Sequence, residues 1–262
     1  MPEGDTIHKV ARVLAPLLVG REVLQVRLAR GVVDRLGGRN VTGVQALGKH
    51  LLIRFDNALT LRSHLGMHGS WHRYDPDEPW RKPARQAVVV LTTASDVLVC
   101  FNAREVEVLR SGGIAGRELE RRLGPDLAAA AFAPGPIPAR ARALLSADTP
   151  VVDLLLDQRV AAGVGNVYKS EVLFLERQPP GRTLGSLSDE AVAALYARAH
   201  ALLRANLSGG PRVTRTAPGP DLWVYGRRGQ PCLHCGAPVS YARLGRGLRP
   251  TYWCPSCQAD SP

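Results

Sequence analysis

The chain has 262 residues, 45% of them hydrophobic, and its 34 Lys and Arg residues against 23 Asp and Glu residues give a formal charge of +11. This length supports two domains without disulfides. The lack of a long apolar run and of a signal-peptide pattern predicts a cytoplasmic protein with no membrane contact. The charge favours a polyanionic partner, because phosphates neutralised by Lys and Arg release counterions; a basic, solvated surface is the alternative.

The first half of the chain predicts one helix followed by a series of short strands. Apolar residues at helical spacing indicate a helix over residues 6–18, with Asp5 or Thr6 as its cap. Segments rich in β-branched residues follow, and their number and turn-type separators predict a β-sandwich or barrel. The expected strands are 23–28, 41–47, 51–55, 59–64, 87–92, 97–101 and 106–109.

The composition then changes to Gly, Pro and Ala, which predicts a hinge or linker at residues 113–130. Beyond it, residues 138–145, 151–161, 166–175 and 188–207 read as helices, some of them capped by Ser or Asn. The sequence therefore predicts a multi-domain chain of α and β type. Its expected parts are a β-sandwich domain at 1–112, the linker, a helical domain at 131–221 and a C-terminal segment at 222–262.

Four of the five cysteines lie in this last segment, as Cys232-x2-Cys235-x18-Cys254-x2-Cys257. This spacing is typical of a structural zinc site in which each thiolate pair grips the metal from one knuckle. Two disulfides are the alternative, and a cytosolic chain disfavours them. Cysteine fills all four positions, so the zinc is expected to be structural, with no catalytic cofactor. Cys100 lies in an apolar strand and reads as core.

The residues between the two cysteine pairs predict a β-hairpin, because apolar residues alternate around central glycines. It carries Arg243, Arg246 and Arg249 toward its tip. A hairpin that zinc holds rigid suits insertion at a DNA groove. The alternative is that these arginines only make the tip soluble.

A Gly-Val-Gly turn precedes Asn166 and separates two expected helices. Such a turn leaves backbone N–H groups unpaired at the positive end of the second helix dipole, and the Asn166 amide adds to them. Together they form a site suited to phosphate. By itself the turn is equally compatible with a simple helical hairpin.

Pro2 and Glu3 directly follow the initiator methionine. Proline is small, so we expect Met1 to be removed, which leaves a secondary amine. Amino-terminal amines titrate close to neutrality, and the unprotonated amine can attack an aldehyde-like carbon to give an iminium. Glu3 supplies a carboxyl group for proton transfer. The alternative is an ordinary disordered terminus.

A nucleotide whose C1′ accepts the amine while the base departs would be a substrate for this pair. The iminium acidifies the C2′ proton, so elimination of the 3′ phosphate and then of the 5′ phosphate can follow. One amine would then serve both base removal and strand cleavage.

The stretches "MPEG", "LLDQRVAAGVGNVYKSEVLF" and "VYGRRGQPCLHCG…RPTYWCPSCQ" together resemble the formamidopyrimidine-DNA glycosylase and endonuclease VIII family. The resemblance spans nearly the whole chain. It implies an N-terminal β-sandwich with flanking helices, then a helix-two-turn-helix domain that ends in a zinc-finger hairpin. It also implies a DNA glycosylase and AP lyase of base excision repair that acts on damaged double-stranded DNA, at the nucleoid in a bacterium.

The resemblance assigns roles residue by residue. Pro2 matches the catalytic nucleophile and Glu3 the general acid/base. Lys49 in "LGKHLL" matches a lysine that lies at the catalytic site and contacts phosphate. Asn166 matches the phosphate-binding asparagine of the helix turn, and Arg249 in "LRPTYWC" matches the zinc-finger arginine that grips phosphate near the lesion.

The stretch "SHLGMHGSW" occupies the place of the residues that fill the hole left by the everted base, which suggests Met67 with His68 beside it. A partly exposed core position is the alternative for Met67, and a structural role is equally open for His64. Thr6 stands where many bacterial members have a second glutamate, next to Asp5, which leaves the details of proton transfer open.

The stretch "FNAREVEVL" lacks the "NDPRRFG"-like pattern of the branch that acts on 8-oxoguanine and is closer to the endonuclease VIII branch. We therefore expect oxidised pyrimidines as the main lesions, and a monomer. A non-catalytic damaged-DNA-binding protein on the same scaffold is the main alternative, and retention of Pro2 and Glu3 argues against it. A zinc-bearing RNA-binding factor is a third hypothesis.

Overall fold

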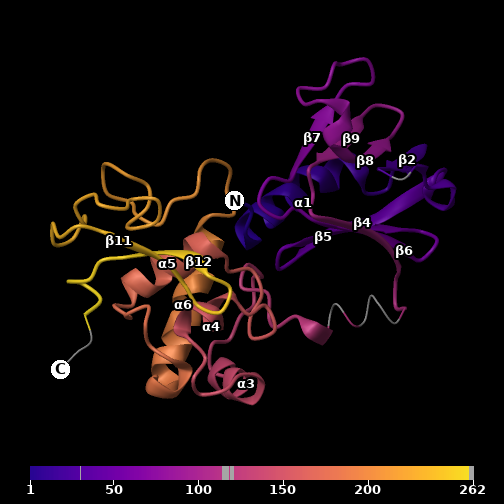
Figure 1. Ribbon diagram of the computed structural model, residues 1–262. Coiled ribbons are helices and arrows are strands. Elements are labelled where there is room, and N and C mark those ends of the chain that lie inside the picture. The colour runs from indigo at the N-terminus through magenta and orange to yellow at the C-terminus, as the bar shows by residue number, and fades with distance from the viewer. Residues whose placement is uncertain (30, 114–117, 119–120, 260–262) are drawn as a thin grey trace. The chain divides into compact units, whose positions relative to one another are not determined.

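The computed structural model describes residues 1–29, 31–113, 118 and 121–259, and the chain divides into two compact units, residues 1–122 and 123–262 (Figure 1). The expected linker at 113–130 lies partly outside the described residues, at 114–117 and 119–120, and stays a prediction. Among the described helices, none has both the length and the apolar character that crossing a membrane requires.

Within its described residues, unit 1 contains two five-stranded sheets whose neighbouring strands all pair antiparallel, which confirms the expected β-sandwich. The first sheet, in spatial order, consists of β1 (Glu22–Val23), β4 (Arg39–Leu47), β5 (His50–Phe55), β6 (Leu59–His64) and β10 (Glu105–Arg110). The second consists of β3 (Gly31–Val32), β2 (Gln25–Leu28), β8 (Ala87–Thr92), β9 (Val97–Phe101) and β7 (Ser70–Tyr74).

The expected single strand at 23–28 is in fact two strands that belong to different sheets. Val23 pairs with Arg39 of β4, whereas Gln25 pairs with Thr92 of β8. Leu24 lies at the switch, where its N–H donates to the Thr92 carbonyl at 2.8 Å. Strands β3 and β7 were not expected, because β3 has two residues and β7 mixes Ser, His and Arg with aromatic residues.

Helix α1 (Gly4–Leu18) confirms the expected N-terminal helix and packs against β4 and β5. Its apolar face is buried through Ile7, Ala11, Leu14 and Leu18, which recur at helical spacing and join the sandwich core. The core therefore fixes the helix that begins directly after Pro2 and Glu3.

Unit 2 contains four described α-helices and a β-hairpin. The helix α6 begins after Ser188, whose Oγ accepts the Ala191 N–H at 3.2 Å, so the expected cap is confirmed. The helices are α3 (Ile137–Leu144), α4 (Val151–Leu156), α5 (Asn166–Leu175) and α6 (Asp189–Ala205), and the hairpin strands are β11 (Ser240–Leu244) and β12 (Arg249–Trp253).

The helix expected at 151–161 ends at Leu156, because the Gln158 side chain organises an irregular turn. Its Nε2 donates to the carbonyls of Leu156 (2.8 Å) and Val164 (3.1 Å), and its Oε1 accepts the Gly163 N–H at 2.9 Å. The Gln158 side chain thus occupies the Leu156 carbonyl, which a continued helix would have paired with the Val160 N–H, and the Val160 N–H donates to the Asp157 carbonyl instead.

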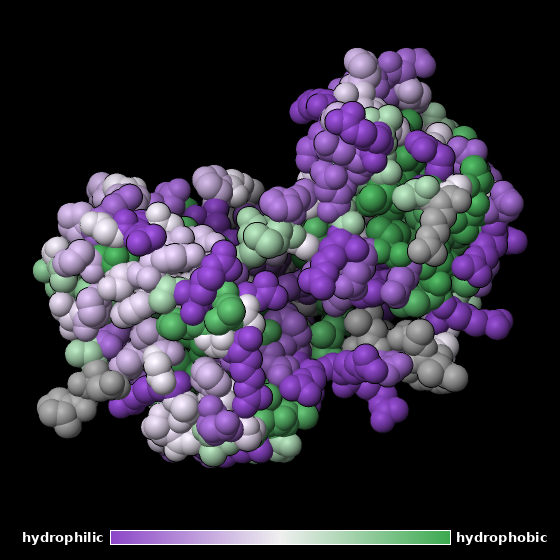
Figure 2. All heavy atoms as spheres, in the orientation of Figure 1, coloured by the Kyte–Doolittle hydropathy of each residue, from purple (hydrophilic) through white to green (hydrophobic). Residues whose placement is uncertain are grey.

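Helix α5 is the centre of unit 2 and is buried from Asn166 through Phe174. It packs against α4, α6 and β12, and Figure 1 shows β12 beside it. Hydrophilic side chains cover most of the face in Figure 2, with a sizeable apolar area on unit 1. Charged side chains are rarely fully buried unless they are paired, so the burial of polar and charged groups along α5 is unusual.

Candidate active site and nucleic-acid interface

The N-terminal residues form an ordered helix start. Glu3, not Asp5 or Thr6 as expected, is the N-cap of α1, and it is 1% exposed. Its carbonyl accepts the N–H groups of Thr6 (3.0 Å) and Ile7 (3.2 Å), and its own N–H donates to Thr6 Oγ1 at 3.4 Å. Pro2 is half-buried directly before this cap, so an ordinary disordered terminus does not describe this segment.

Thr6, which stands where the resemblance implies a second glutamate, and its neighbour Asp5 support the same helix start. Thr6 Oγ1 donates to Asp5 Oδ1 at 3.3 Å while it accepts the Glu3 N–H. Asp5 is 1% exposed. The Thr6 hydroxyl therefore orients the Glu3 backbone by accepting its N–H. A glutamate at position 6 would accept the same N–H with its carboxylate.

Lys49 lies in the tight turn between β4 and β5, where Gly48 has a φ of +56°, a value that favours glycine. Burial lowers the pKa of both His50 and His64, and the charge of the half-buried Lys49 lowers it further. Lys49 therefore lies in unit 1, as Pro2 and Glu3 do, and next to a pair of histidines.

His50 and His64 face each other across β5 and β6, with ring centroids 5.0 Å apart. The Arg62 guanidinium donates to His50 Nδ1 at 2.9 Å and forms ion pairs with Glu105 and Glu107, each at 3.0 Å. Burial, the neighbouring His64 and Arg62 lower the pKa of His50 to about 3, and burial also lowers the pKa of His64. Both rings are therefore neutral beside Lys49 at physiological pH.

We expect His50 to remain neutral in the folded protein down to pH 4, whereas in the unfolded chain it protonates near pH 6.5. The native state then binds fewer protons, so stability present above pH 6.5 falls as the pH drops toward 3, by at most about 1.4 kcal/mol per pH unit from this group. NMR titration of the His50 ring measures this directly, with the urea-unfolded chain as control. A folded-state midpoint above pH 5 contradicts the prediction.

Met67 and His68 lie in the turn between β6 and β7 and point away from the core. Met67 is 60% exposed, so it is not a core residue, and His68 is also exposed. The turn is tight: the Gly69 N–H donates to the Leu65 carbonyl at 3.0 Å, and a Cβ on Gly69 would lie 2.4 Å from that oxygen. The backbone thus presents Met67 at a fixed position.

Asn166 is the first residue of α5, follows Gly165 as N-cap, and is 7% exposed. The positive end of a ten-residue helix therefore coincides with the residue that was expected to bind phosphate.

Two charged residues further along α5, which were not expected to matter, are fully buried and bind the C-terminal part of the chain. The Lys169 ammonium donates to the Pro250 carbonyl and to Thr251 Oγ1, at 2.7 Å each. The Glu171 carboxylate accepts the three backbone N–H groups of residues 223–225 at 2.8–2.9 Å. Their signal in the sequence is a Lys and a Glu inside the otherwise apolar stretch "VYKSEVLF".

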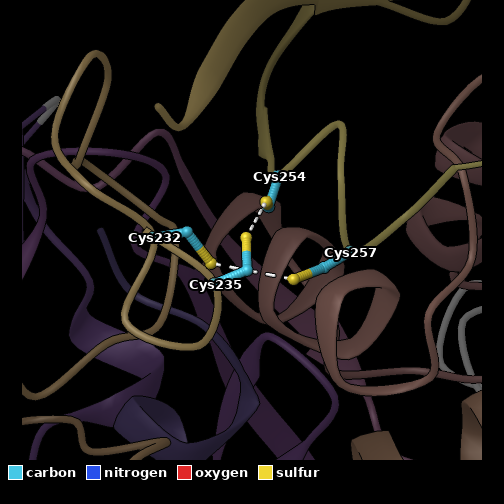
Figure 3. A group of neighbouring side chains, drawn as sticks. All are labelled: Cys232, Cys235, Cys254 and Cys257. Carbon is cyan, nitrogen blue, oxygen red and sulfur yellow. Dashed lines mark hydrogen bonds between the residues drawn. The ribbon is translucent and has the colours of Figure 1, made fainter. Parts of the chain in front are cut away.

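The four cysteines converge in the region of the hairpin, with their sulfur atoms pointing toward one another (Figure 3). All four Sγ atoms lie within 4.8 Å of one another, with 3.9 Å between Cys232 and Cys257 and 3.5 Å between Cys235 and Cys254. The expected set of four ligands therefore forms one site that could hold a metal ion. Cys100 is buried in β9, as expected, and burial raises its pKa to about 12.

The hairpin between the cysteine pairs is confirmed, and its three arginines have different surroundings. Arg249 opens β12 and is exposed, and the Arg243 Nη1 donates to the Leu248 carbonyl at 3.4 Å. Arg246, in the turn, forms an ion pair with Asp148 at 3.4 Å, and its backbone N–H donates to Asp153 at 2.7 Å. The Arg246 side chain is thus engaged within the protein.

Comparison with known proteins matches both units to one family. Residues 1–108 match the formamidopyrimidine-DNA glycosylase N-terminal domain, and residues 123–217 match the H2TH domain of the same family. The chain is 42% identical to the "Probable endonuclease 8 2" of Streptomyces coelicolor, over 99% of this chain and 94% of that protein. It is 38% identical to the "DNA-(apurinic or apyrimidinic site) lyase Nei2" of Mycolicibacterium smegmatis, over the full length of both.

A solved structure of the wild-type Lactococcus lactis Fpg, in a complex with DNA that contains N7-benzyl-Fapy-dG, has the same fold. The TM-score is 0.84 at 24% identity, over 99% of this chain and 100% of that one. The relatives at 42% and 38% identity carry endonuclease 8 and Nei2 names, in agreement with the branch that the stretch "FNAREVEVL" indicates. The chain therefore belongs to the formamidopyrimidine-DNA glycosylase and endonuclease 8 family, on its endonuclease 8 branch.

Proposed function

We propose that this chain removes oxidised pyrimidines from damaged double-stranded DNA with Pro2 as nucleophile and cleaves the strand by β,δ-elimination. Its family makes it a DNA glycosylase and AP lyase of base excision repair. The observation that carries the proposal is the ordered N-terminus, in which buried Glu3 caps α1 directly after Pro2. A binding-only protein has no need of a nucleophile and a carboxylate on a fixed helix start.

The chemistry requires removal of Met1, which is 40% exposed. The Pro2 nitrogen then bonds to C1′, and the base leaves with the electron pair of the glycosidic bond and a proton. Opening of the C1′–O4′ bond, with a proton from Glu3, gives the iminium. Loss of the C2′ proton expels the 3′ phosphate, and a second elimination expels the 5′ phosphate.

Three residues are proposed to bind the phosphates of the DNA. Lys49 supplies a positive charge beside the neutral His50 and His64. Asn166 opens the buried helix α5, where the helix dipole favours an anion. Arg249 is exposed at the start of β12 and can form a charge-assisted bond with a phosphate.

Met67 and His68 are proposed to occupy the space that the everted base leaves. The tight turn after β6 exposes Met67 at a fixed backbone position, which suits a wedge between bases. Methionine is unbranched and polarizable, so it can stack against bases of different shape.

We propose that the cysteine cluster holds one structural Zn²⁺. A tetrahedral site with Zn–S bonds of about 2.3 Å requires sulfur–sulfur distances of roughly 3.8 Å. The separations of 3.9 Å between the Sγ atoms of Cys232 and Cys257 and of 3.5 Å between those of Cys235 and Cys254 fit this geometry. Four thiolates complete the coordination, so the metal would hold the two knuckles together without joining the reaction.

The proposed substrate class is tested with duplexes that each contain one lesion. We expect dihydrouracil and thymine glycol to be excised faster than 8-oxoguanine opposite cytosine, on the order of tenfold or more in single-turnover rate. The matched control is the same duplex without a lesion. Fastest excision of 8-oxoguanine would contradict the pyrimidine preference.

Two results of binding assays with the same duplexes would replace the proposal. Tight binding of lesion duplexes without base release or strand cleavage indicates the non-catalytic damaged-DNA-binding protein. Competition by undamaged RNA as effective as that by lesion duplex indicates an RNA-binding factor.

A further inference from the structure

Arg249 is exposed, whereas the strand that carries it, β12, is hydrogen-bonded to buried side chains of α5. Lys169, which is 0% exposed, donates to the carbonyl of Pro250, the residue after Arg249, and to Thr251 Oγ1, at 2.7 Å each. Thr251 Oγ1 in turn donates to the Arg249 carbonyl at 3.0 Å. One buried ammonium thus ties the backbone on the C-terminal side of Arg249 and, through a hydroxyl, the carbonyl of Arg249 itself.

The same helix ties the next residue of the strand to Asn166. The Tyr252 N–H donates to Ser170 Oγ at 3.3 Å, and Ser170 Oγ donates to the Asn166 carbonyl at 3.1 Å. Asn166 and β12 are therefore linked through a single turn of α5. Both proposed phosphate ligands of unit 2 take their positions from this helix.

The hairpin turn that precedes Arg249 is held at a second point, on α4. Asp153 accepts the Arg246 N–H at 2.7 Å, and a Cβ on Gly245 would lie 2.3 Å from the other Asp153 oxygen. Gly245 has a φ of +73°, so it is suited both to the close approach and to the turn. Asp148 adds the ion pair to the Arg246 guanidinium at 3.4 Å.

We propose that Lys169 and Asp153 are positioning residues that hold the hairpin on either side of Arg249, so that its guanidinium meets the phosphate without prior ordering of the strand. The inference rests on the phosphate-binding role proposed for Arg249. The side chain of Arg249 is exposed. Pairing with Leu244 of β11 orders its backbone within the hairpin, and the buried and turn contacts fix the hairpin on α5 and α4. Pre-organisation of this kind increases affinity by lowering the ordering cost on binding.

Lys169→Met tests the first contact, because methionine keeps the length of the stem and removes the three donors. Asp153→Ala tests the second, and Thr251→Val removes only the hydroxyl link. We expect Lys169→Met to weaken the binding of abasic-site duplex on the order of tenfold, with smaller reductions for Asp153→Ala and Thr251→Val. Metal content is measured on each variant.

The decisive readout is the coupling to Arg249. Arg249→Ala removes one phosphate-binding cation, which lowers the slope of log Kd against log salt by about 0.9. We expect Lys169→Met to lower the slope similarly, and the double variant to bind no more weakly than Arg249→Ala. The charge-matched control is Lys82→Met in unit 1, where Lys82 donates to Ser70 Oγ, and it should keep the wild-type slope.

Additive effects in the double variant, or wild-type binding by Lys169→Met, would overturn the inference. If Lys169→Met loses metal, Asp153→Ala and Thr251→Val decide by the same coupling test. An Arg249→Ala protein with wild-type affinity and slope would instead refute the proposed phosphate role of Arg249. Failure of the inference and failure of the proposed function are thereby separated.

Discussion

A covalent adduct between the protein and a duplex with one abasic site, trapped with borohydride, is expected to map to Pro2. Pro2→Leu should lower its yield at least about 100-fold. Leucine is too large for removal of the preceding methionine, so the amine moves by one residue, about 3.5 Å. A displacement of this size in a covalent step costs on the order of 100-fold or more. Gel quantification and peptide mass spectrometry of the adduct measure both effects.

Glu3→Gln is the matched control for this experiment, because it keeps the amine and changes only the neighbouring carboxylate. It should still yield a trapped adduct from a preformed abasic site, since the open-chain aldehyde needs no cleavage of the C1′–O4′ bond, while formation of the iminium from a damaged nucleotide slows. An adduct on Lys49 would identify Lys49, rather than Pro2, as the nucleophile. No adduct from metal-loaded protein that lacks Met1 would refute the proposed mechanism and favour the binding-only hypothesis.

Replacing Cys254 by Ser is expected to abolish binding of the proposed Zn²⁺ and to weaken the binding of abasic-site duplex at least about tenfold. Cys254 is fully buried and directly follows β12, the strand that begins with Arg249. Structural Zn²⁺ contributes about 10 kcal/mol or more to the folding of small zinc modules, so its loss releases both knuckles. Elemental analysis of the protein and fluorescence anisotropy of labelled duplex measure the two effects.

Cys100→Ala is the control for the cysteine experiment, because Cys100 lies in the core of the sandwich and outside the cluster. This variant should retain one metal ion per chain and wild-type affinity. A chelator that strips the metal without a change in Kd would contradict the role of the metal in shaping the hairpin. Elemental analysis that finds another metal in place of zinc would overturn the zinc assignment.

Features that have a local physical cause could be predicted from the sequence. Two thiolates separated by two residues can grip one metal ion in many backbone settings, and so the convergence of Cys232, Cys235, Cys254 and Cys257 on one site that could hold a metal ion follows from spacing. Apolar residues at helical spacing likewise located α1, α5 and α6 to within a few residues. The adjacency of Pro2 and Glu3 at the N-terminus is a property of the chain itself, although their chemistry remains a prediction.

Other features appear only in the folded protein, and the buried charges among them depend on partners far along the chain. Lys169 bonds residues that lie 81 and 82 positions away, and Asp153 accepts an N–H from a residue 93 positions away. Nothing in the spacing around either residue specifies these partners. The end of α4 at Leu156 has a local cause that periodicity does not report, because the Gln158 side chain bonds the backbone groups of Leu156, Gly163 and Val164. Periodicity reports which face of a segment is buried, whereas packing decides which distant polar group meets a buried charge, because burial without a partner is costly.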